Sequence, residues 1–204
     1  MGSTGLHVSS SDATLWAVVI GAVLATVGGF VATQLEAFMH RRERERGAAL
    51  LFGEILSVLE LITTMAAEAR GHGDPYGPMT LRLLRAAGRE TETYDRNRES
   101  LYDLRNPMVR GQIHAVMVRI ILSLEGVADA TAQIALTEAA ANALDSGDPK
   151  RADAEARLGV LLENRDTSFD FAVQTVGQIG LIIRVLRPLA KQDFGAYASV
   201  VRNP

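Results

Sequence analysis

The chain has 204 residues but no cysteine, few aromatic residues and almost no lysine. Without cysteine, disulfides, thiolate metal sites, iron–sulfur clusters and cysteine nucleophiles are excluded. Aromatic residues make up 5% and hydrophobic residues 48%, a composition that favours a helical protein rich in Ala, Leu, Ile and Val over a sheet protein. Only Lys150 and Lys191 among the 21 basic residues are lysine. We interpret this arginine bias as the mark of a bacterium with a GC-rich genome.

Strong net charge and known catalytic motifs are also lacking. The formal net charge of −3 shows no electrostatic footprint for nucleic acid, so we expect no nucleic-acid partner. The patterns G-x-S-x-G, G-x-x-x-x-G-K-[ST], the dinucleotide fingerprint and the EF-hand loop do not occur. The four histidines have no metal-ligand spacing, and the Glu-x-x-His pair of metal-binding helical bundles is missing. We therefore expect no cofactor, no metal and no enzymatic activity. An enzyme that uses scattered carboxylates such as Glu54, Glu60 or Glu68 is the weakest alternative.

One long uncharged apolar run lies near the N-terminus, from Ala13 to Ala32. About 20 apolar residues let a helix cross the hydrocarbon core of a bilayer, so the sequence predicts a membrane helix over 13–39. Residues 1–12 contain no Lys or Arg, whereas four arginines follow the run. The positive-inside rule then places residues 1–12 outside and the rest of the chain in the cytoplasm, in the inner membrane of a bacterium. A cleaved signal peptide is disfavoured because the run is long and no positive charge precedes it.

The basic segment 40–47 has two interpretations. Arg41, Arg42, Arg44 and Arg46 can contact anionic lipid headgroups, which attract juxtamembrane arginines by about 1 kcal/mol each. Glu43 and Glu45 dilute the positive charge. The sequence therefore favours a stop-transfer flank with weak headgroup contact.

Small residues recur at every fourth position of the apolar run: Ala13, Ala17, Gly21, Ala25, Gly29, Thr33 and Ala37. Small side chains let membrane helices approach closely. Each step of four residues turns the helix by about 400°, so the stripe drifts and one straight partner meets only part of it. We predict helix packing through Ala17, Gly21, Ala25 and Gly29, at a right-handed crossing of about −40°. The alternative is that Gly and Ala are common in any membrane helix.

The segment 48–190 is expected to form a cytoplasmic antiparallel bundle of about four helices. The first ends at Arg70-Gly71, and Gly71–Pro78 is a loop. Pro78 begins the second helix, which we expect to run to about Arg105, and Asn106-Pro107 and Asp148-Pro149 begin the others. In the first helix a seam with steps of four and three predicts the core face: Leu51, Ile55, Val58, Ile62, Met65 and Ala69. A second row widens this face: Phe52, Leu56, Leu59 and Ala66.

The third and fourth helices carry apolar faces of the same kind. The third face consists of Val109, Ile113, Val116, Ile120, Val127 and Ile134, and the fourth of Phe169, Ala172, Val176, Ile179, Ile183 and Leu186. Polar residues interrupt the apolar run of the fourth helix, which favours a buried helix over a second span. A break in that helix is most plausible within 163–168, although no Gly or Pro requires one there. The tail 191–204 is expected to be irregular.

The densest polar stretch, 90–103, is interpreted first as a solvated helix face. Its charges are spaced to pair by i,i+4 and i,i+3, as Glu92–Arg96, Asp95–Arg98 and Arg96–Glu99. The second interpretation is a protein-docking surface through Tyr94, Arg98 and Tyr102, since Tyr and Arg are favoured interface anchors. Catalysis is the least favoured. His114, next to an apolar face, is expected to be a packed or surface residue.

These observations predict an all-α protein with five segments: an outer tail (1–12), a membrane helix (13–39), a basic juxtamembrane segment (40–47), a cytoplasmic bundle (48–190) and a tail (191–204). The function expected is that of a non-enzymatic accessory or scaffold subunit. Its membrane helix would pack against helices of another protein or of a second copy. The alternative is a membrane-tethered signalling or sensory module, which needs a bistable element that the sequence does not display.

Overall fold

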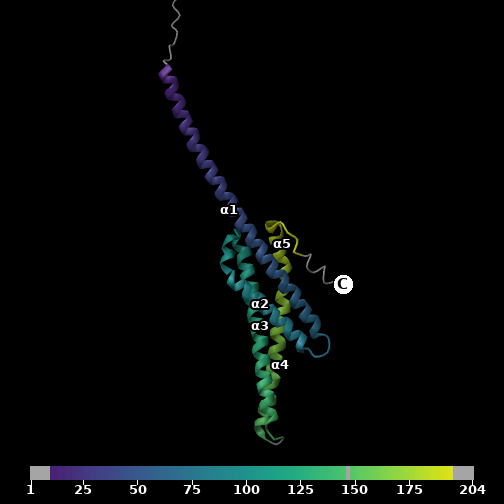
Figure 1. Ribbon diagram of the computed structural model, residues 1–204. Coiled ribbons are helices and arrows are strands. Elements are labelled where there is room, and N and C mark those ends of the chain that lie inside the picture. The colour runs from purple at the N-terminus through teal and green to yellow at the C-terminus, as the bar shows by residue number, and fades with distance from the viewer. Residues whose placement is uncertain (1–9, 146–147, 195–204) are drawn as a thin grey trace, which may run out of the picture. The chain divides into compact units, whose positions relative to one another are not determined.

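The computed structural model describes residues 10–145 and 148–194, with side chains from residue 18 onward. The described residues contain no β-strand, which confirms the all-helical prediction. They form α1 (Ser10–Arg70), α2 (Pro78–Arg96), the 3₁₀ helix η1 (Arg98–Asp103), α3 (Pro107–Asn142), α4 (Pro149–Val176) and α5 (Ile179–Ala190) (Figure 1). The chain divides into two compact units, residues 1–44 and 45–204, and α1 supplies residues to both.

In the first unit, every side chain from Val18 to Arg44 is exposed. α1 is long and apolar enough here to cross a membrane, and none of its most apolar window is buried by the rest of the chain. The hydroxyls of Thr26 and Thr33 donate to the carbonyls of Ala22 and Gly29, at 2.8 and 2.9 Å. Neither hydroxyl therefore depends on water for a hydrogen bond.

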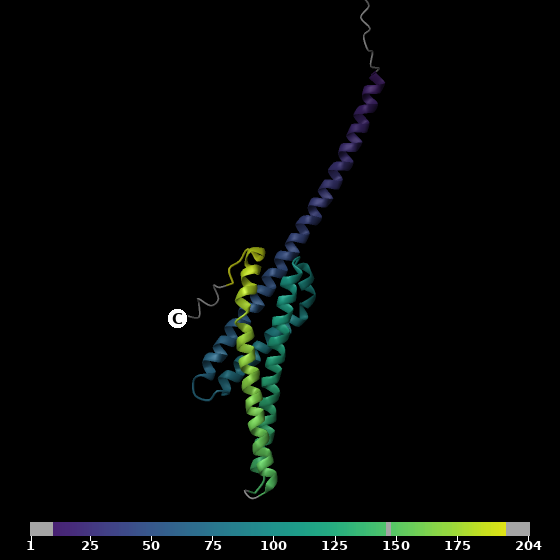
Figure 2. The same ribbon diagram turned by 180° about the vertical axis from the view of Figure 1, so that it is seen from behind.

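In the second unit, α1 from residue 45, α2, the first part of α3 and the α4–α5 segment pack around one apolar core (Figures 1 and 2). The chain reverses direction between α1 and α2 and between α3 and α4, whereas α5 continues the line of α4. The second half of α3 and the first half of α4 extend beyond this core as a two-helix hairpin. Few side chains are buried in this hairpin, and most of them are small. Among the described residues they are Ala130, Ile134 and Ala141 of α3.

The most buried face of α1 is the row that the sequence analysis treated as the flank of the seam. Phe52, Leu56, Leu59 and Ala66 are completely buried. The expected seam lies at the edge of the core, because Leu51, Val58, Ile62, Met65 and Ala69 are only partly buried, and Ile55 is its one buried member. Spacing alone defines a wide stripe, and only the position of the neighbouring helices decides its centre. By contrast, every residue of the predicted faces of α3 and α4–α5 is buried.

The helix starts follow their predicted caps. The side chain of Asn106 accepts from the backbone N–H of Met108 at 2.9 Å, and that of Asp148 accepts from the N–H of Lys150 at 2.9 Å. Pro78, Pro107 and Pro149 each occupy the first helical turn. Proline suits this position because its missing N–H would have no partner in the helix.

Two expected helix limits were wrong. α2 ends at Arg96, not near Arg105, because the Asn97 side chain donates to the carbonyl of Thr93 at 2.8 Å and the chain continues as η1. The last helix is interrupted at Gly177-Gln178, not within 163–168. At this step the N–H of Gln178 bonds to the carbonyl of Thr175, three residues back, so the helix tightens for one turn without changing direction sharply.

Residues 163–168 stay helical because tertiary contacts hold them. Asp166 accepts hydrogen bonds from Arg70 at the end of α1 (2.9 Å) and from the hydroxyl of Tyr76 in the α1–α2 loop (2.6 Å). Arg70 also forms an ion pair with Asp170. The Arg165 guanidinium lies 3.7 Å from the centre of the Tyr76 ring, close enough for a cation–π contact. This group of side chains fastens the α1–α2 loop to α4.

The start of the C-terminal tail belongs to the core, although the sequence analysis separated it at residue 191. Lys191 has a left-handed backbone conformation with φ of 55°, which ends α5. Phe194 then turns inward and is almost completely buried. Its ring lies against Gly53 of α1, where a side chain would meet the ring at 2.2 Å. The residues after 194 lie outside the described part of the chain.

The contact between Gly53 and Phe194 predicts that alanine substitutions at two glycines of α1 have opposite effects on stability. Gly53→Ala forces a methyl group into the buried ring and should destabilise the second unit by about 1–3 kcal/mol. Gly47→Ala meets nothing within 4 Å and should stabilise α1 by up to about 1 kcal/mol. Thermal unfolding of the purified full-length variants measures both. Equal midpoints for the two variants would show that Phe194 does not pack on Gly53.

Because the Tyr76 hydroxyl is hydrogen-bonded and partly buried, we expect the protein to lose stability at alkaline pH. Burial, assisted by its hydrogen bond to Asp166, raises the pKa of Tyr76 well above its usual value near 10. Because the folded pKa exceeds the unfolded one, the contribution is complete below about pH 10 and is lost as the pH rises through the folded pKa. The unfolding midpoint should therefore fall from pH 9 to pH 11, and should fall less in Tyr76→Phe. Identical pH dependence in both proteins would argue against this assignment.

Candidate functional site

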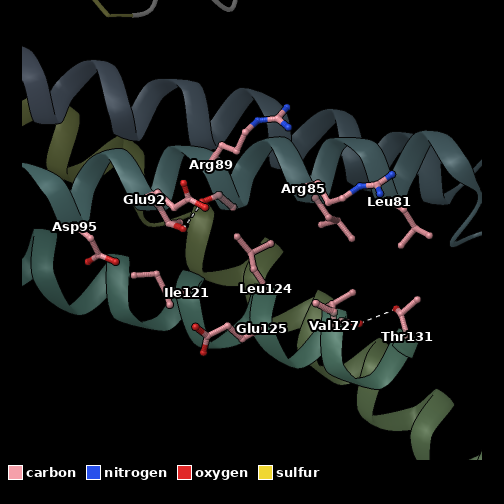
Figure 3. Close-up of a pocket in the computed structure, with 14 residues that line it drawn as sticks. Leu81, Arg85, Arg89, Glu92, Asp95, Ile121, Leu124, Glu125, Val127 and Thr131 are labelled. Atoms are coloured by element: carbon pink, nitrogen blue, oxygen red, sulfur yellow. Dashed lines mark hydrogen bonds between the residues drawn. The ribbon is translucent and has the colours of Figure 1, made fainter. Parts of the chain in front are cut away.

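A cleft of about 510 Å³ lies between α2 and α3 (Figure 3). Leu81 and Leu84 of α2 and Ile121, Leu124 and Val127 of α3 form its apolar floor. Two small residues that face it, Gly88 and Ala128, leave the space open, and a side chain at Gly88 would meet nothing within 4 Å. Its volume is within the range of small-molecule sites, about 300–1,000 Å³.

Charged residues surround the mouth of the cleft: Arg85, Arg89, Glu92 and Asp95 on α2 and Glu125 on α3. Figure 3 shows Glu92 and Asp95 toward one end and Leu81 and Thr131 at the other. No ion pair involves any of these five side chains within the described ranges. Charges of both signs are therefore available to a ligand or a partner.

The ion pairs expected along the polar stretch do not form in the described structure. Arg96 donates to the hydroxyl of Thr93 at 3.3 Å, and Arg98 lies 3.4 Å from Nε2 of His114. Helix α2 ends at Arg96, so Arg98 and Glu99 no longer continue its i,i+3 geometry. The ion pairs that favoured the interpretation of this stretch as a solvated helix face are therefore absent from the described structure.

The lining of the cleft suits binding better than covalent chemistry. Its two hydroxyls are already engaged, since Thr91 donates to the carbonyl of Gly88 and Thr131 to that of Val127, both at 2.7 Å. The lining residues include neither a histidine nor a lysine to activate a nucleophile. What remains is an apolar floor with carboxylates and guanidinium groups at its rim. That combination recognises an amphipathic ligand or side chains of another protein.

Of the three predicted docking residues, Tyr94 is buried and cannot contact a partner. It is 1% exposed, and its ring packs edge-on against Phe52, with centroids 6.1 Å apart. Its hydroxyl lies 2.8 Å from Nδ1 of His114. Tyr102, at 79%, and Arg98 are exposed. The eight-residue spacing of the tyrosines suggested one face, but η1 interrupts the helix between them and sends them to different surroundings.

His114 joins Tyr94 to Arg98. Both ring nitrogens have neighbours, the Tyr94 hydroxyl at Nδ1 and the Arg98 guanidinium at Nε2. The Arg98 guanidinium can only donate, whereas the Tyr94 hydroxyl can donate or accept. His114 was expected to be a packed or a surface residue, and it is partly buried.

The four juxtamembrane arginines do not form one surface. Arg46 belongs to the second unit, where its Nε donates to the carbonyl of Ala190 at 3.2 Å and so satisfies the end of α5. Arg42 lies over the ring of Phe38, 5.1 Å from its centre. Arg41 and Arg44 are exposed, in a region that also holds His40, Glu36 and Glu43.

The predicted packing face of α1 is open. A side chain added at Gly21 or Gly29 would meet nothing within 4 Å, and Ala25 is exposed. The side chain of Ala17 lies outside the described residues. Gly28, which is outside the predicted four-residue stripe, is also open. It follows Gly21 by seven residues, so the two share a face within about 20°.

Within the described residues, no group of three or more His, Asp or Glu side chains is placed to hold a metal ion. Comparisons with protein-family models, with curated proteins and with solved structures find no match to this chain.

The different surroundings of Tyr94 and Tyr102 predict different effects of the same substitution. Tyr94→Phe removes the hydrogen bond to His114 and should lower the free energy of unfolding by about 0.5–1.5 kcal/mol. Tyr102→Phe, on an exposed ring, should leave it within about 0.5 kcal/mol. Denaturant unfolding of the two variants distinguishes them. A larger loss for Tyr102→Phe would contradict the burial of Tyr94.

Proposed function

We propose that the chain is a non-enzymatic, single-pass membrane protein that acts as an accessory or scaffold subunit through helix packing. The observation that carries this proposal is the exposed apolar half of α1. From Val18 to Met39 its only charged side chain is Glu36, and no described part of the chain covers it. In water such a surface would aggregate, whereas in a bilayer it needs no cover.

Two helical segments are apolar and long enough to cross a membrane, but they differ in how much of their surface the rest of the chain buries. The window in the α4–α5 segment is 44% buried inside the second unit, whereas that of α1 is 0% buried. The buried face of α4–α5 supplies the core residues Phe169, Ile179 and Leu186. A helix engaged in a core is not free to span, so we assign the membrane helix to α1 alone.

The two hydroxyls in the exposed half of α1 support a lipid environment. Thr26 and Thr33 bond back to carbonyls of their own helix. In hydrocarbon an unbonded polar group costs several kcal/mol, so this arrangement suits a span. The arginines after Met39 support an orientation with the N-terminus outside and the second unit in the bacterial cytoplasm, with weak contact to anionic headgroups.

Helix packing is the role that these surfaces favour over catalysis. Gly21, Ala25 and Gly29 leave the backbone of α1 open to a second helix, and a close approach stabilises helix pairs in lipid. The partner is a helix of another protein or of a second copy. The alternative role is a tethered signalling module, favoured by one observation: α1 supplies residues to both units.

The proposal predicts that added bulk on one face of α1 disrupts an assembly. Gly21→Leu combined with Gly29→Leu should block close approach and shift the protein from a larger complex to a lone chain. Val23→Phe combined with Val27→Phe adds comparable bulk on the opposite side of the helix and should leave the complex intact. Native mass spectrometry after mild-detergent extraction from native membranes measures both.

A lone monomer of the unmodified protein, together with no effect of the glycine pair, would defeat the packing proposal. Equal disruption by both pairs would mean that bulk anywhere on α1 matters, and that the small residues have no special role. A ligand-dependent change in cross-linking between helices would favour signalling over scaffolding.

A further inference from the structure

The cleft between α2 and α3 carries its charges in a definite order along its length. On α2, Arg85 and Arg89 come before Glu92 and Asp95, so the sign of the charge changes once along the helix. The facing helix α3 adds Glu125. Figure 3 shows the two guanidinium groups toward one end of the cleft and the three carboxylates toward the other. We call these the basic end and the acidic end.

The antiparallel arrangement of the two helices keeps these ends apart. Tyr94 of α2 contacts His114 of α3 near the acidic end, whereas Leu81 and Thr131 lie at the basic end. Side chains of a helix lean toward its N-terminus. The long arginines of α2 therefore reach toward the basic end, and Glu125 of α3 leans toward the acidic end. Within the described residues, no ion pair joins the two sets of charges.

Other charged residues near the cleft do not change this order. Arg82 of α2 and Asp129 of α3 are exposed near the basic end, outside the lining, and their charges are opposite. Beyond the acidic end, Arg96 and Arg98 each have a hydrogen-bonding neighbour of their own. The cleft therefore presents opposite charges at its two ends.

Between the two ends the cleft is apolar and open. Its floor consists of leucine, isoleucine and valine side chains, and Gly88 and Ala128 leave space above them. Arg89 and Asp95 are six residues apart, which is about 9 Å along the helix. A molecule that reaches both ends therefore needs an elongated apolar body between its charged groups. The volume of about 510 Å³ suits a small molecule.

We propose that the cleft binds a small zwitterionic molecule with an apolar body, whose cation meets the acidic end and whose anion meets the basic end. The apolar body covers the floor, and the two charged groups fix the orientation. Guanidinium groups donate charge-assisted hydrogen bonds to an anion, and carboxylates accept them from a cation. A ligand with one sign of charge places like charges together at one end, which disfavours it. An elongated ω-amino acid has the required chemistry.

Three probes of one length test the charge order. They are ω-aminooctanoate, which is zwitterionic, octanedioate, which carries two negative charges, and diaminooctane, which carries two positive charges. Ligand-observed NMR titration of the full chain in phosphatidylcholine nanodiscs measures binding, and empty nanodiscs correct for partition into lipid. We expect ω-aminooctanoate to bind at least about threefold more tightly than either of the other probes.

Reversing the charge of one end should change which probe binds best. Arg85→Glu combined with Arg89→Glu makes both ends acidic, so diaminooctane should become the tightest ligand. Glu92→Lys combined with Asp95→Lys makes both ends mainly basic, so octanedioate should become the tightest. Arg82→Glu, on the same helix but outside the lining, should leave the order of the probes unchanged. All five positions are exposed, so these variants change charge without altering the core.

Filling the cleft tests its location. Gly88→Leu adds a side chain that begins with nothing within 4 Å, and it should reduce binding of every probe below detection. Gly111→Leu is the matched control, because Gly111 is equally open but lies on α3 outside the lining. It should leave binding unchanged. Circular dichroism of each variant checks that the helices remain folded.

Absence of binding, equal affinity of the three probes, an order unchanged by both charge reversals, or binding that survives Gly88→Leu would overturn the proposal. So would a partner protein that co-purifies with the unmodified chain and is lost in Gly88→Leu while no probe binds, since the occupant would then be a protein. The inference concerns the second unit and does not rest on packing through α1. Its failure therefore leaves the test of the α1 glycine pair unaffected.

Discussion

Phe52, Leu56 and Leu59 lie on one face of α1, completely removed from water, and the second unit is assembled around them. Burying side chains of this size contributes about 1.5–3 kcal/mol each. Tyr94 of α2 packs on Phe52, and Phe194 closes over Gly53. α1 is thus the centre of the core as well as the membrane candidate. The same helix has an uncovered apolar surface in one unit and a covered one in the other.

Beside this core, between α2 and α3, a cleft has an apolar floor and charges of both signs at its rim, none of them paired within the described structure. The two hydroxyls that line it are engaged by backbone carbonyls of their own helices. Its lining therefore suits non-covalent binding better than covalent chemistry.

Some ion pairs in the described residues connect elements that are distant in the sequence. Arg70 reaches Asp166 and Asp170 on α4, and Arg105 pairs with Glu45 at the start of the second unit. Local pairs along α2, which its spacing suggested, are not made. Exposed local pairs contribute only about 0.3–0.5 kcal/mol, so small changes in the backbone decide whether they form. The charges left over on α2 and α3 are what gives the cleft its polar rim.

The sequence by itself determined the helical class, the helix starts and the buried faces of α3 and α4–α5, because proline, capping side chains and apolar spacing act over a few residues. The apolar run of α1 was likewise visible as composition. Tertiary structure alone decided the centre of the α1 face and the burial of Tyr94 and Phe194. It also decided that residues 163–168 stay helical, since Tyr76 and Arg70 hold Asp166 from about 90 positions away. The cleft depends on which helices lie side by side, and no local pattern encodes that.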